Sequence, residues 1–393
     1  MKRCKWFMMS SVLLLSMWSC SSDDDNSGEG QQVPILLSGV DVSGHTSRAL
    51  VTDITDFQKD GFHVMGYKQI GENGIPQQIF NDQYVSYISS EWTYSPIKYW
   101  DIRAYKYLFT AYSPSKMHVG TGHLGLEGQK MVFSGFSNWM SIGVCDESHI
   151  SSVDGENKLL GCETRKDGAD AFYDVMLAHS EGLTSEYLSQ NGIVNLEFRH
   201  LQAMIVFNVT YPNINIGGEE TPTYYVSNIK IPANLVPVAS GTWNYEYGYD
   251  EDRNLSGTYT GISYGTESSM FDFYGSSTLG ETPVEAIKYP HLIKRGLVCP
   301  FDLPKGKQFQ FNVTYYRGER GLKGTGKTAT GALALMPVKT ITVDPSVGLT
   351  KFEAGKIYTF TLKFDSGVGL DLVDVYVSDW NVGETITQNF HNW

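Results

Sequence analysis

Residues 192–210 have the sequence GIVNLEFRHLQAMIVFNVT, and this stretch indicates two β-strands in succession. Apolar and polar residues alternate over residues 194–198, which places the apolar side chains on one face of a strand. Residues 201–209 form a second, mostly apolar run. We expect these two strands to pair with each other, with His200 at their connection as a residue satisfied by hydrogen bonds.

The rest of the chain shows the same strand pattern, with little helical periodicity. Most periodic segments alternate, or are short apolar runs bounded by Gly, Pro, Asn or Asp. The composition agrees, because 13% of the residues are aromatic and 40 of the 393 are glycine, which favours strands and turns. Strands without alternating long helices predict an all-β fold of sandwiches. Further strand candidates are residues 33–42, 61–67, 91–94, 98–100, 105–112, 224–231, 309–316, 338–343, 357–364 and 373–377. Residues 171–178 could form either a short helix or a strand.

The length predicts two domains. Without residues 1–19, 374 of the 393 residues remain, which exceeds a typical domain of about 100 to 200 residues. The strand pattern loosens over residues 180–192, so we predict an N-terminal domain of residues 33–190 and a C-terminal domain of residues 191–393. A hydrophobic content of 41% is enough for two cores.

The N-terminus has the order of a secretory signal. Basic residues open the chain, apolar and small residues follow over residues 7–18, and Ser19 and Cys20 close the run. The apolar part is shorter than the roughly 20 residues of a membrane-spanning helix. The arrangement resembles a bacterial lipoprotein signal, so we predict a signal peptide of residues 1–19 and lipid attachment at Cys20. The alternative is an ordinary signal peptide followed by an incidental cysteine.

An acidic segment follows Cys20. Residues 21–25 read SSDDD, which resembles the signal that sends Bacteroidota lipoproteins to the cell surface. The alternative is a solvated acidic linker. Residues 20–32 are polar and glycine-containing, so they cannot form a core and are predicted to act as a linker. We therefore expect a surface-exposed lipid anchor in the outer membrane, and no other membrane contact.

Charge and cysteine content exclude several classes of protein. The net charge is −13, which disfavours binding to nucleic acid because phosphate neutralisation needs a basic surface. Beyond Cys20, the remaining cysteines are Cys145, Cys162 and Cys299. Three cysteines cannot all pair within one chain, and their spacing contains no CxxC, so neither a disulfide framework nor a zinc site is expected. A Cys145–Cys162 bridge stays open but is not favoured.

Motifs with catalytic potential are weak. Residues 321–328, GLKGTGKT, match the P-loop pattern. A P-loop needs a following helix, but strand features return at Val338, so a basic hairpin loop is the better interpretation. His118 and His123 are close in sequence but have no nearby carboxylates, and no HExxH or GxSxG motif is present. A pair of glycosidase carboxylates is not singled out either. We predict no enzymatic activity, no cofactor and no metal.

An aromatic cluster occupies residues 92–109. If the segment is a strand, Tyr105, Tyr107 and Phe109 share one face. Such residues usually belong to a core, but exposed rings could also form a platform for carbohydrate.

The order of several short motifs resembles the fimbrillin family, the subunits of Bacteroidota type V pili, and particularly its fimbrillin-like lipoprotein branch. The likeness begins with the leader that ends at Cys20 and with the acidic run, and it spans nearly the whole mature chain. The other motifs lie at residues 46–49, 92–100, 108–114, 174–178, 198–205, 355–362 and 375–380.

The resemblance implies two tandem transthyretin-like β-sandwich domains on a surface lipoprotein. It also implies that an arginine-directed protease cuts after the first strand and that a neighbouring subunit donates a strand in its place. Arg48 and Ala49 match the processing position, so a cut between them would release residues 33–42 together with the lipid. An open sandwich edge is expected to recruit a strand from another chain. The alternative is that Arg48 is an ordinary surface arginine.

The expected function is that of a structural and adhesive subunit of a cell-surface fimbrium, assembled by donor-strand exchange and mediating cell adhesion. Its partners would be other pilus subunits, the outer membrane through Cys20, and a host or bacterial surface receptor. Stalk, tip and anchor roles stay open, and the loop-rich residues 240–300 favour a tip or accessory role. The alternative function is that of a surface glycan-binding lipoprotein of a nutrient-uptake system.

Overall fold

Strands dominate the structure, a computed structural model. It describes residues 32–39, 57–59, 61–113, 124–127, 130–136, 139–140, 150–153, 156–159, 176–212, 222–237, 243–249, 255–275, 283–318 and 333–379. Within these residues, helix is limited to a turn at residues 57–59, α2 (Thr184–Ser189) and the 3-10 turn Pro345–Val347. No helix in this part of the chain is long and apolar enough to cross a membrane. The predicted all-β fold is confirmed.

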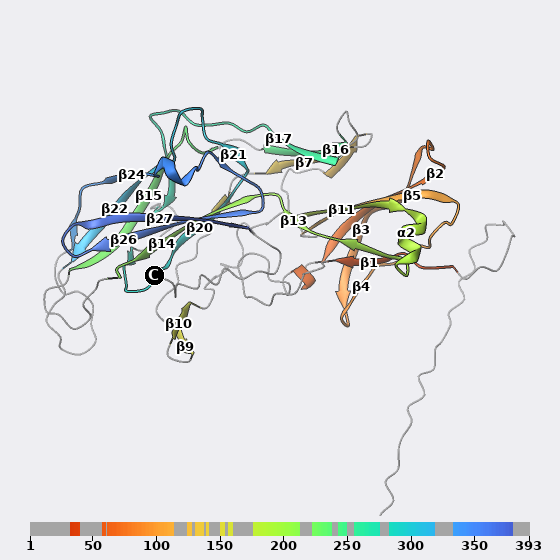
Figure 1. The fold of residues 1–393 in the computed structure, drawn as a ribbon, viewed down its shortest axis with the longest axis horizontal. Helices are drawn as coiled ribbons and strands as arrows, with labels where there is room; N and C mark the ends of the chain where they lie inside the picture. Colours follow the sequence, from red (N-terminus) through yellow and green to blue (C-terminus); the bar gives the residue numbers. More distant parts are fainter. Residues whose placement is uncertain are drawn as a thin grey trace, which may run out of the picture.

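Two groups of strands lie along the long axis of the molecule (Figure 1). The first group is built on a six-stranded antiparallel sheet with the order β13-β11-β5-β2-β3-β4. These strands are β2 (Phe62–Ile70), β3 (Pro76–Ile88), β4 (Glu91–Thr93), β5 (Ala104–Ser113), β11 (Met176–Leu183) and β13 (Arg199–His200). A small sheet of two parallel strands, β1 (Leu36–Gly39) and β12 (Ile193–Leu196), accompanies it.

The first hydrophobic core joins these two sheets and is rich in aromatic rings. Phe62 and Val64 of β2 and Tyr107 and Phe109 of β5 contribute to it, together with Ile35 and Leu37 of the β1 segment. In each pair the two residues lie two positions apart, and the residue between them is less buried, which is the period-2 pattern of a strand with one buried face. Helix α2 adds Tyr187, whose ring stacks on Trp100 with centroids 5.0 Å apart.

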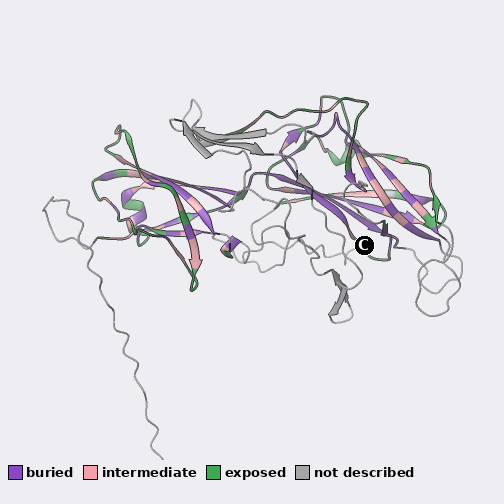
Figure 2. Cartoon of the chain, turned by 180° about the vertical axis from the view of Figure 1, so that it is seen from behind, coloured by how far each residue is buried: buried purple, intermediate pink, exposed green. Residues whose placement is uncertain are grey.

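The second group contains two sheets, of five and six strands, with a separate core. One sheet has the order β27-β26-β14-β20-β8, and the other the order β18-β15-β22-β23, with β19 paired to β15 and β24 to β22. The strands are β8 (Trp139–Met140), β14 (Ala203–Thr210), β15 (Thr223–Pro232), β18 (Met270–Tyr274), β19 (Val284–Glu285), β20 (His291–Val298), β22 (Gln310–Gly318), β23 (Ala334–Leu335), β24 (Lys339–Thr342), β26 (Lys356–Asp365) and β27 (Gly369–Asp379). Phe207 of β14 lies at the centre, with its ring 4.8 to 5.1 Å from those of Phe273, Phe311 and Phe360. Figure 2 shows buried residues concentrated along the strands of both groups.

Three smaller sheets complete the described residues. One joins β6 (Leu124–Glu127), β7 (Lys130–Phe136), β16 (Trp243–Tyr249) and β17 (Leu255–Thr260). The others pair β9 (Ile150–Val153) with β10 (Glu156–Leu159), and β21 (Phe301–Asp302) with β25 (Lys351–Phe352).

The structure corrects the prediction that residues 194–198 and 201–209 pair with each other. β12 instead pairs in parallel with β1, and β14 lies between β20 and β26. The two strands belong to different cores, because Val194 and Leu196 pack in the first and the alternate residues of β14 pack in the second. His200, between them, is buried and pairs in β13 with β11.

The first core extends from Ile35 to Phe198, and the second from Ala203 to Leu370. The division of the chain into domains 33–190 and 191–393 stays a prediction. Residues 171–178, left open between helix and strand, fall partly outside the described residues, and the described part from Met176 begins β11.

Candidate strand-exchange site

Strand β1 lies in a slot between two other parts of the first group of strands. We call this position the β1 slot, bounded by residues 98–100 on one side and by residues 192–196 on the other. On the first side, Ile35 N donates a hydrogen bond to Lys98 O at 2.9 Å, and Trp100 N donates one to Val33 O at 3.0 Å. On the second side, Leu36 N donates to Gly192 O at 3.0 Å, where the parallel ladder with β12 begins. Residues 33–39 are therefore bound on both sides, by residues 98–100 just before β1 and by β12 along β1.

Side chains of the β1 segment alternate between the core and solvent. Ile35 and Leu37 are 1% and 5% exposed, whereas Leu36 between them is 44% exposed. Gly39 follows on the inward side, where an added Cβ would lie 2.7 Å from Phe62 Cε1 and 3.1 Å from Trp92 Cε2. The slot thus accommodates large side chains at positions 35 and 37 but has no room for a side chain at position 39.

Two aromatic side chains bind the main chain of this segment directly. Tyr94 OH donates a hydrogen bond to Ile35 O at 2.7 Å, and Trp92 Nε1 donates one to Gly39 O at 2.8 Å. Because both bonds go to backbone carbonyls, they would form with any strand of the same register. Burial raises the pKa of Tyr94, so its hydroxyl stays protonated as a donor.

The end of the slot is closed by packed rings. Phe62 lies 4.9 Å from Trp92 and 5.3 Å from Phe198 between ring centroids, and Phe57 lies 5.2 Å from Trp92 and 4.8 Å from Phe198. Phe57 and Phe62 are fully buried. The rings hold one another in place at the position of Gly39.

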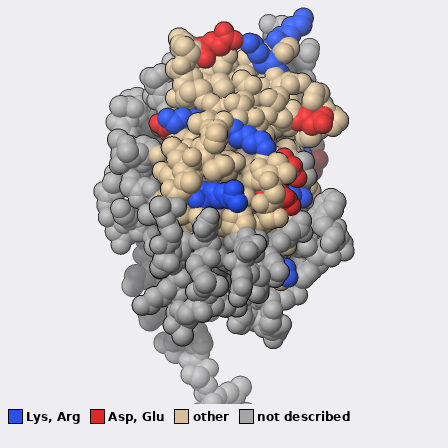
Figure 3. Space-filling model, turned by 90° about the vertical axis from the view of Figure 1, so that its left-hand side faces the viewer, with Lys and Arg blue, Asp and Glu red and all other residues tan. Residues whose placement is uncertain are grey.

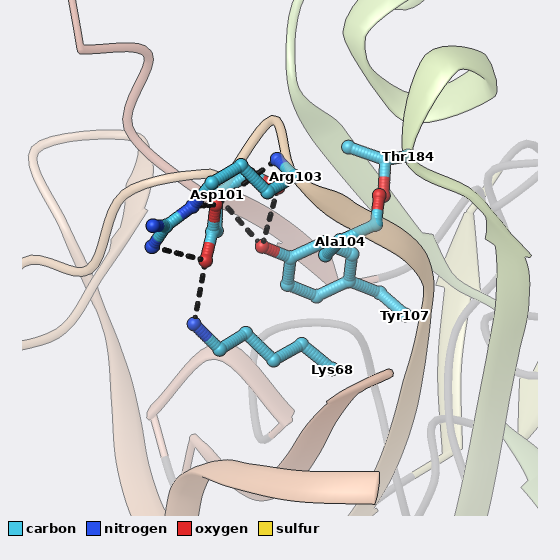
Figure 4. A network of polar contacts seen from close by, with 6 residues as sticks. All are labelled: Lys68, Asp101, Arg103, Ala104, Tyr107 and Thr184. Carbon is cyan, nitrogen blue, oxygen red and sulfur yellow. Dashed lines mark hydrogen bonds and ion pairs between the residues drawn. The ribbon is translucent and has the colours of Figure 1, made fainter. Parts of the chain in front are cut away.

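The wall formed by residues 98–100 is fixed by a polar network that contains no residue of β1 (Figure 4). Asp101 accepts hydrogen bonds from Lys68 Nζ at 2.8 Å and Arg103 Nε at 3.1 Å, and Asp101 N donates to Tyr107 OH at 2.7 Å. The hydrogen bond from Arg103, with that from Lys68, holds the pKa of Asp101 far below its usual range against the opposing effect of burial. Nearby, Thr184 Oγ1 donates to Ala104 O at 2.6 Å and ties α2 to β5. This network anchors the chain directly after the wall through contacts that do not involve β1.

A second polar cluster lies on the face of β2 turned away from the first core, since His63 alternates with the core residues of that strand. His63 Nδ1 lies 3.1 Å from Asp82 Oδ1, and Tyr112 OH donates to the same oxygen at 2.6 Å. Burial lowers the pKa of His63, but the hydrogen bond and charge of Asp82 outweigh it, so the pKa is raised above its ordinary value. This cluster joins β2, β3 and β5 and does not contact the slot residues named above.

The predicted site residues Cys20, Arg48 and Ala49 lie outside the described residues, as do His118, His123, Cys145, Cys162 and the P-loop match of residues 321–328. Their assignments stay predictions. The predicted first strand, residues 33–42, is described as far as Gly39, and Arg48 follows Gly39 by nine positions in the sequence. Cys299 is buried, and burial raises the pKa of its thiol to about 12. No group of three or more metal-ligating side chains lies together in the described part of the chain.

The aromatic cluster belongs mainly to the core and not to a carbohydrate platform. Tyr94, Trp100, Tyr107 and Phe109 are all buried. Tyr105 is 40% exposed, so the prediction that it shares the face of Tyr107 and Phe109 is wrong. The pairing of β2 with β5 skips Tyr105 at a register shift, and such a bulge turns the extra residue away from its neighbours' face.

A separate cleft of about 510 Å³ lies in the second group of strands. Its lining includes Gln310 and Asn312 of β22 beside Thr342 and Thr340 of β24, respectively. Thr340 Oγ1 donates to Asn312 Oδ1 at 2.8 Å. Amide and hydroxyl groups both donate and accept hydrogen bonds, and the lining also contains the ion pair of Lys307 with Glu267, so this cleft offers polar groups to a hydroxyl-rich ligand. On the face shown in Figure 3, basic and acidic residues are interspersed among uncharged ones and form no basic patch.

Sequence reasoning missed how residues 92–101 act on β1. The hydrogen bonds from Trp92 and Tyr94 to β1 span more than fifty positions of sequence, and no local pattern reports them. The same holds for β12, whose partner proved to be β1.

Comparisons with known proteins agree with this architecture. The sequence profile described as fimbrillin-like matches residues 47–380. A fimbrial protein of Bacteroides vulgatus has a similar solved structure, with a TM-score of 0.55 and 13% identity over 88% of this chain and 99% of that one. A proposed cell adhesion protein of Bacteroides uniformis aligns over 89% of this chain and 98% of that one, with 13% identity and a TM-score of 0.41. A search of curated proteins found no match.

Proposed function

The chain belongs to the fimbrillin-like family, and we propose from this premise that it is a structural and adhesive subunit, of tip or accessory type, of a cell-surface fimbrium assembled by donor-strand exchange. In this proposal β1 is a temporary occupant of its slot, and a strand of a neighbouring subunit replaces it. Fold and family support a fimbrial role, and the exchange itself is our inference.

The observation that carries the proposal is the placement of β1 between two walls. Removal of residues 33–39 would leave Lys98 O and the N–H of Trp100 without their present partners, and Gly192 O would keep only its hydrogen bond from Trp100 Nε1. It would also open the space that Ile35 and Leu37 now fill in the core. An apolar groove with unpaired backbone groups on both sides recruits an extended strand from another chain.

Cleavage after Arg48 would allow β1 to leave its slot and so open this groove. In our proposal the chain reaches the outer membrane through a lipid on Cys20, after loss of residues 1–19. A cut between Arg48 and Ala49 then severs the only covalent link between β1 and the rest of the fold. Residues 20–32 would serve as the tether before that cut.

We further propose that the two cores mark two tandem β-sandwich domains of transthyretin-like type. The first core ends at Phe198 and the second begins at Ala203. The proposed domains are residues 33–190 and 191–393, and the start of the second contributes Val194, Leu196 and Phe198 to the first core. Catalysis is no part of the proposed role, and the proposed partners are other fimbrial subunits and a surface receptor.

A matched pair of strains tests the proposal. One expresses the native chain, and the other expresses Arg48→Lys, which keeps the positive charge but is not a substrate for an arginine-specific protease. We expect the native chain in filaments sheared from the cells and the Arg48→Lys chain to remain with the membrane. Equal amounts of both chains in the filaments would refute the processing step and the exchange that depends on it.

One observation favours a second candidate function, the binding of a surface glycan. This observation is the polar cleft lined by Gln310 and Asn312. Trp100 cannot serve as a platform for the glycan, because it is buried in the first core. A glycan array probed with the native chain and with Gln310→Ala tests this candidate. Binding that is lost in the variant supports it, and an array with no bound glycan removes it.

A further inference from the structure

We propose that the β1 slot selects the strand that enters it, and that it accepts a segment of the form large apolar, any residue, large apolar, any residue, glycine. The occupant is thus an extended segment of another subunit with this pattern, running parallel to β12 as β1 does. This inference rests on the proposed exchange of β1 and specifies which strands can enter the slot.

The first two requirements follow from the pockets that Ile35 and Leu37 fill. Both side chains are almost fully buried and belong to the first core. A small or charged side chain at either place would leave a void or an uncompensated polar group in that core. The intervening Leu36 is exposed, so the slot leaves this position free.

The glycine requirement is steric. An added Cβ at Gly39 would lie 2.7 Å from Phe62 Cε1, closer than a non-bonded carbon contact permits. Phe62 cannot give way, because it is fully buried and packed against Phe57, Trp92 and Phe198. Trp92 is itself held by its hydrogen bond to Gly39 O. Any side chain at this place would have to displace the whole ring cluster.

Residues 380–393 of a second copy do not match the pattern. Their sole glycine is Gly383, and the residues two and four positions before it are Asn381 and Asp379. Neither is a large apolar residue, so this segment of a second copy is not the expected occupant.

A peptide-exchange experiment tests the selectivity. The mature chain carries Cys20→Ser to keep it free of lipid, and a site for a sequence-specific protease replaces residues 44–48. After cleavage, a tenfold excess of a fluorescent peptide of residues 33–42 is added, and fluorescence anisotropy follows its entry. Uncut chain is the control. Parallel peptides carry Gly39→Ala, Leu37→Ala or Leu36→Ala, and another has the sequence of residues 380–393.

We expect the native peptide to enter the cut chain but not the uncut chain. The Gly39→Ala and Leu37→Ala peptides should bind at least about tenfold more weakly, the Leu36→Ala peptide within about threefold of the native one, and the tail peptide not measurably. If the native and Gly39→Ala peptides bind equally well, the selectivity is refuted while strand exchange stands. If not even the native peptide enters the cut chain, β1 is not replaceable and the proposed function itself fails.

Discussion

Two neighbouring leucines provide a matched test of how β1 is seated. Leu37 is 5% exposed and belongs to the first core, whereas Leu36 is 44% exposed. Replacing a leucine by alanine removes three carbon atoms, worth about 2.4 kcal/mol of transfer free energy when fully buried at about 0.8 kcal/mol each. The cavity left behind adds to this, so Leu37→Ala should lower the free energy of unfolding by about 3 to 4 kcal/mol. Leu36→Ala should lower it by about 1 kcal/mol.

Equilibrium unfolding in urea measures the difference. With a slope of about 2 kcal/mol per M, the midpoint of the transition that involves the first core should fall by about 1.5 to 2 M in Leu37→Ala and by about 0.5 M in Leu36→Ala. The slope itself should stay unchanged in both variants. Equal shifts for the two leucines, or a larger shift for Leu36→Ala, would show that β1 does not sit in the slot in the register described.

Three further predictions concern polar contacts. Trp92→Phe removes the hydrogen bond to Gly39 O, so β1 should lose about 1 kcal/mol of stabilisation, seen as faster amide exchange in residues 33–39; unchanged exchange would contradict the contact. Asp82→Asn should lower the pKa of His63, measured by NMR titration, because Asp82 raises that pKa against the effect of burial. The raised pKa of His63 stabilises the native chain at pH values below the pKa of the unfolded state, about 6.5, and this stabilisation is lost as the pH rises through the folded pKa. Asp82→Asn should abolish that pH dependence. An unchanged pKa of His63 in the variant would refute this prediction. Asp101→Asn should lower the Tm at neutral pH, and lower it less in acid. The depressed pKa of Asp101 stabilises the fold above about pH 4, and this stabilisation is lost as the pH falls through the folded pKa. An equal loss of Tm at pH 7 and pH 3 would contradict this.

The sequence predicts the strands better than their partners. Residues 61–67 of the β2 segment and 105–112 of β5 are predicted as strands, as is the continuous apolar run of β14, because turn residues and apolar patterns are local features of the sequence. Pairing depends on contacts between distant segments, so the stretch 192–210 was assigned one hairpin where the structure has strands of two cores. Tyr105 was misplaced for a related reason, since a bulge is set by the partner strand and not by the local pattern.

The same division holds for the candidate site. The sequence identified a first strand and an arginine after it, and the family motifs implied that this strand is exchanged. It did not identify the tether from Tyr94, the network at Asp101 or the ring cluster at Gly39, because each joins residues far apart in the chain. The tether from Tyr94 binds the β1 segment itself, whereas the network at Asp101 and the rings around Gly39 shape the slot around it.

The proposed function requires that a strand of another subunit takes the place of β1. A cryo-electron microscopy reconstruction of filaments sheared from cells that express the native chain tests it most directly. We expect the reconstruction to show a strand of a neighbouring subunit between residues 98–100 and 192–196, with a glycine against Phe62 and Trp92. Filaments in which that place is held by residues 36–39 of the same chain would contradict it.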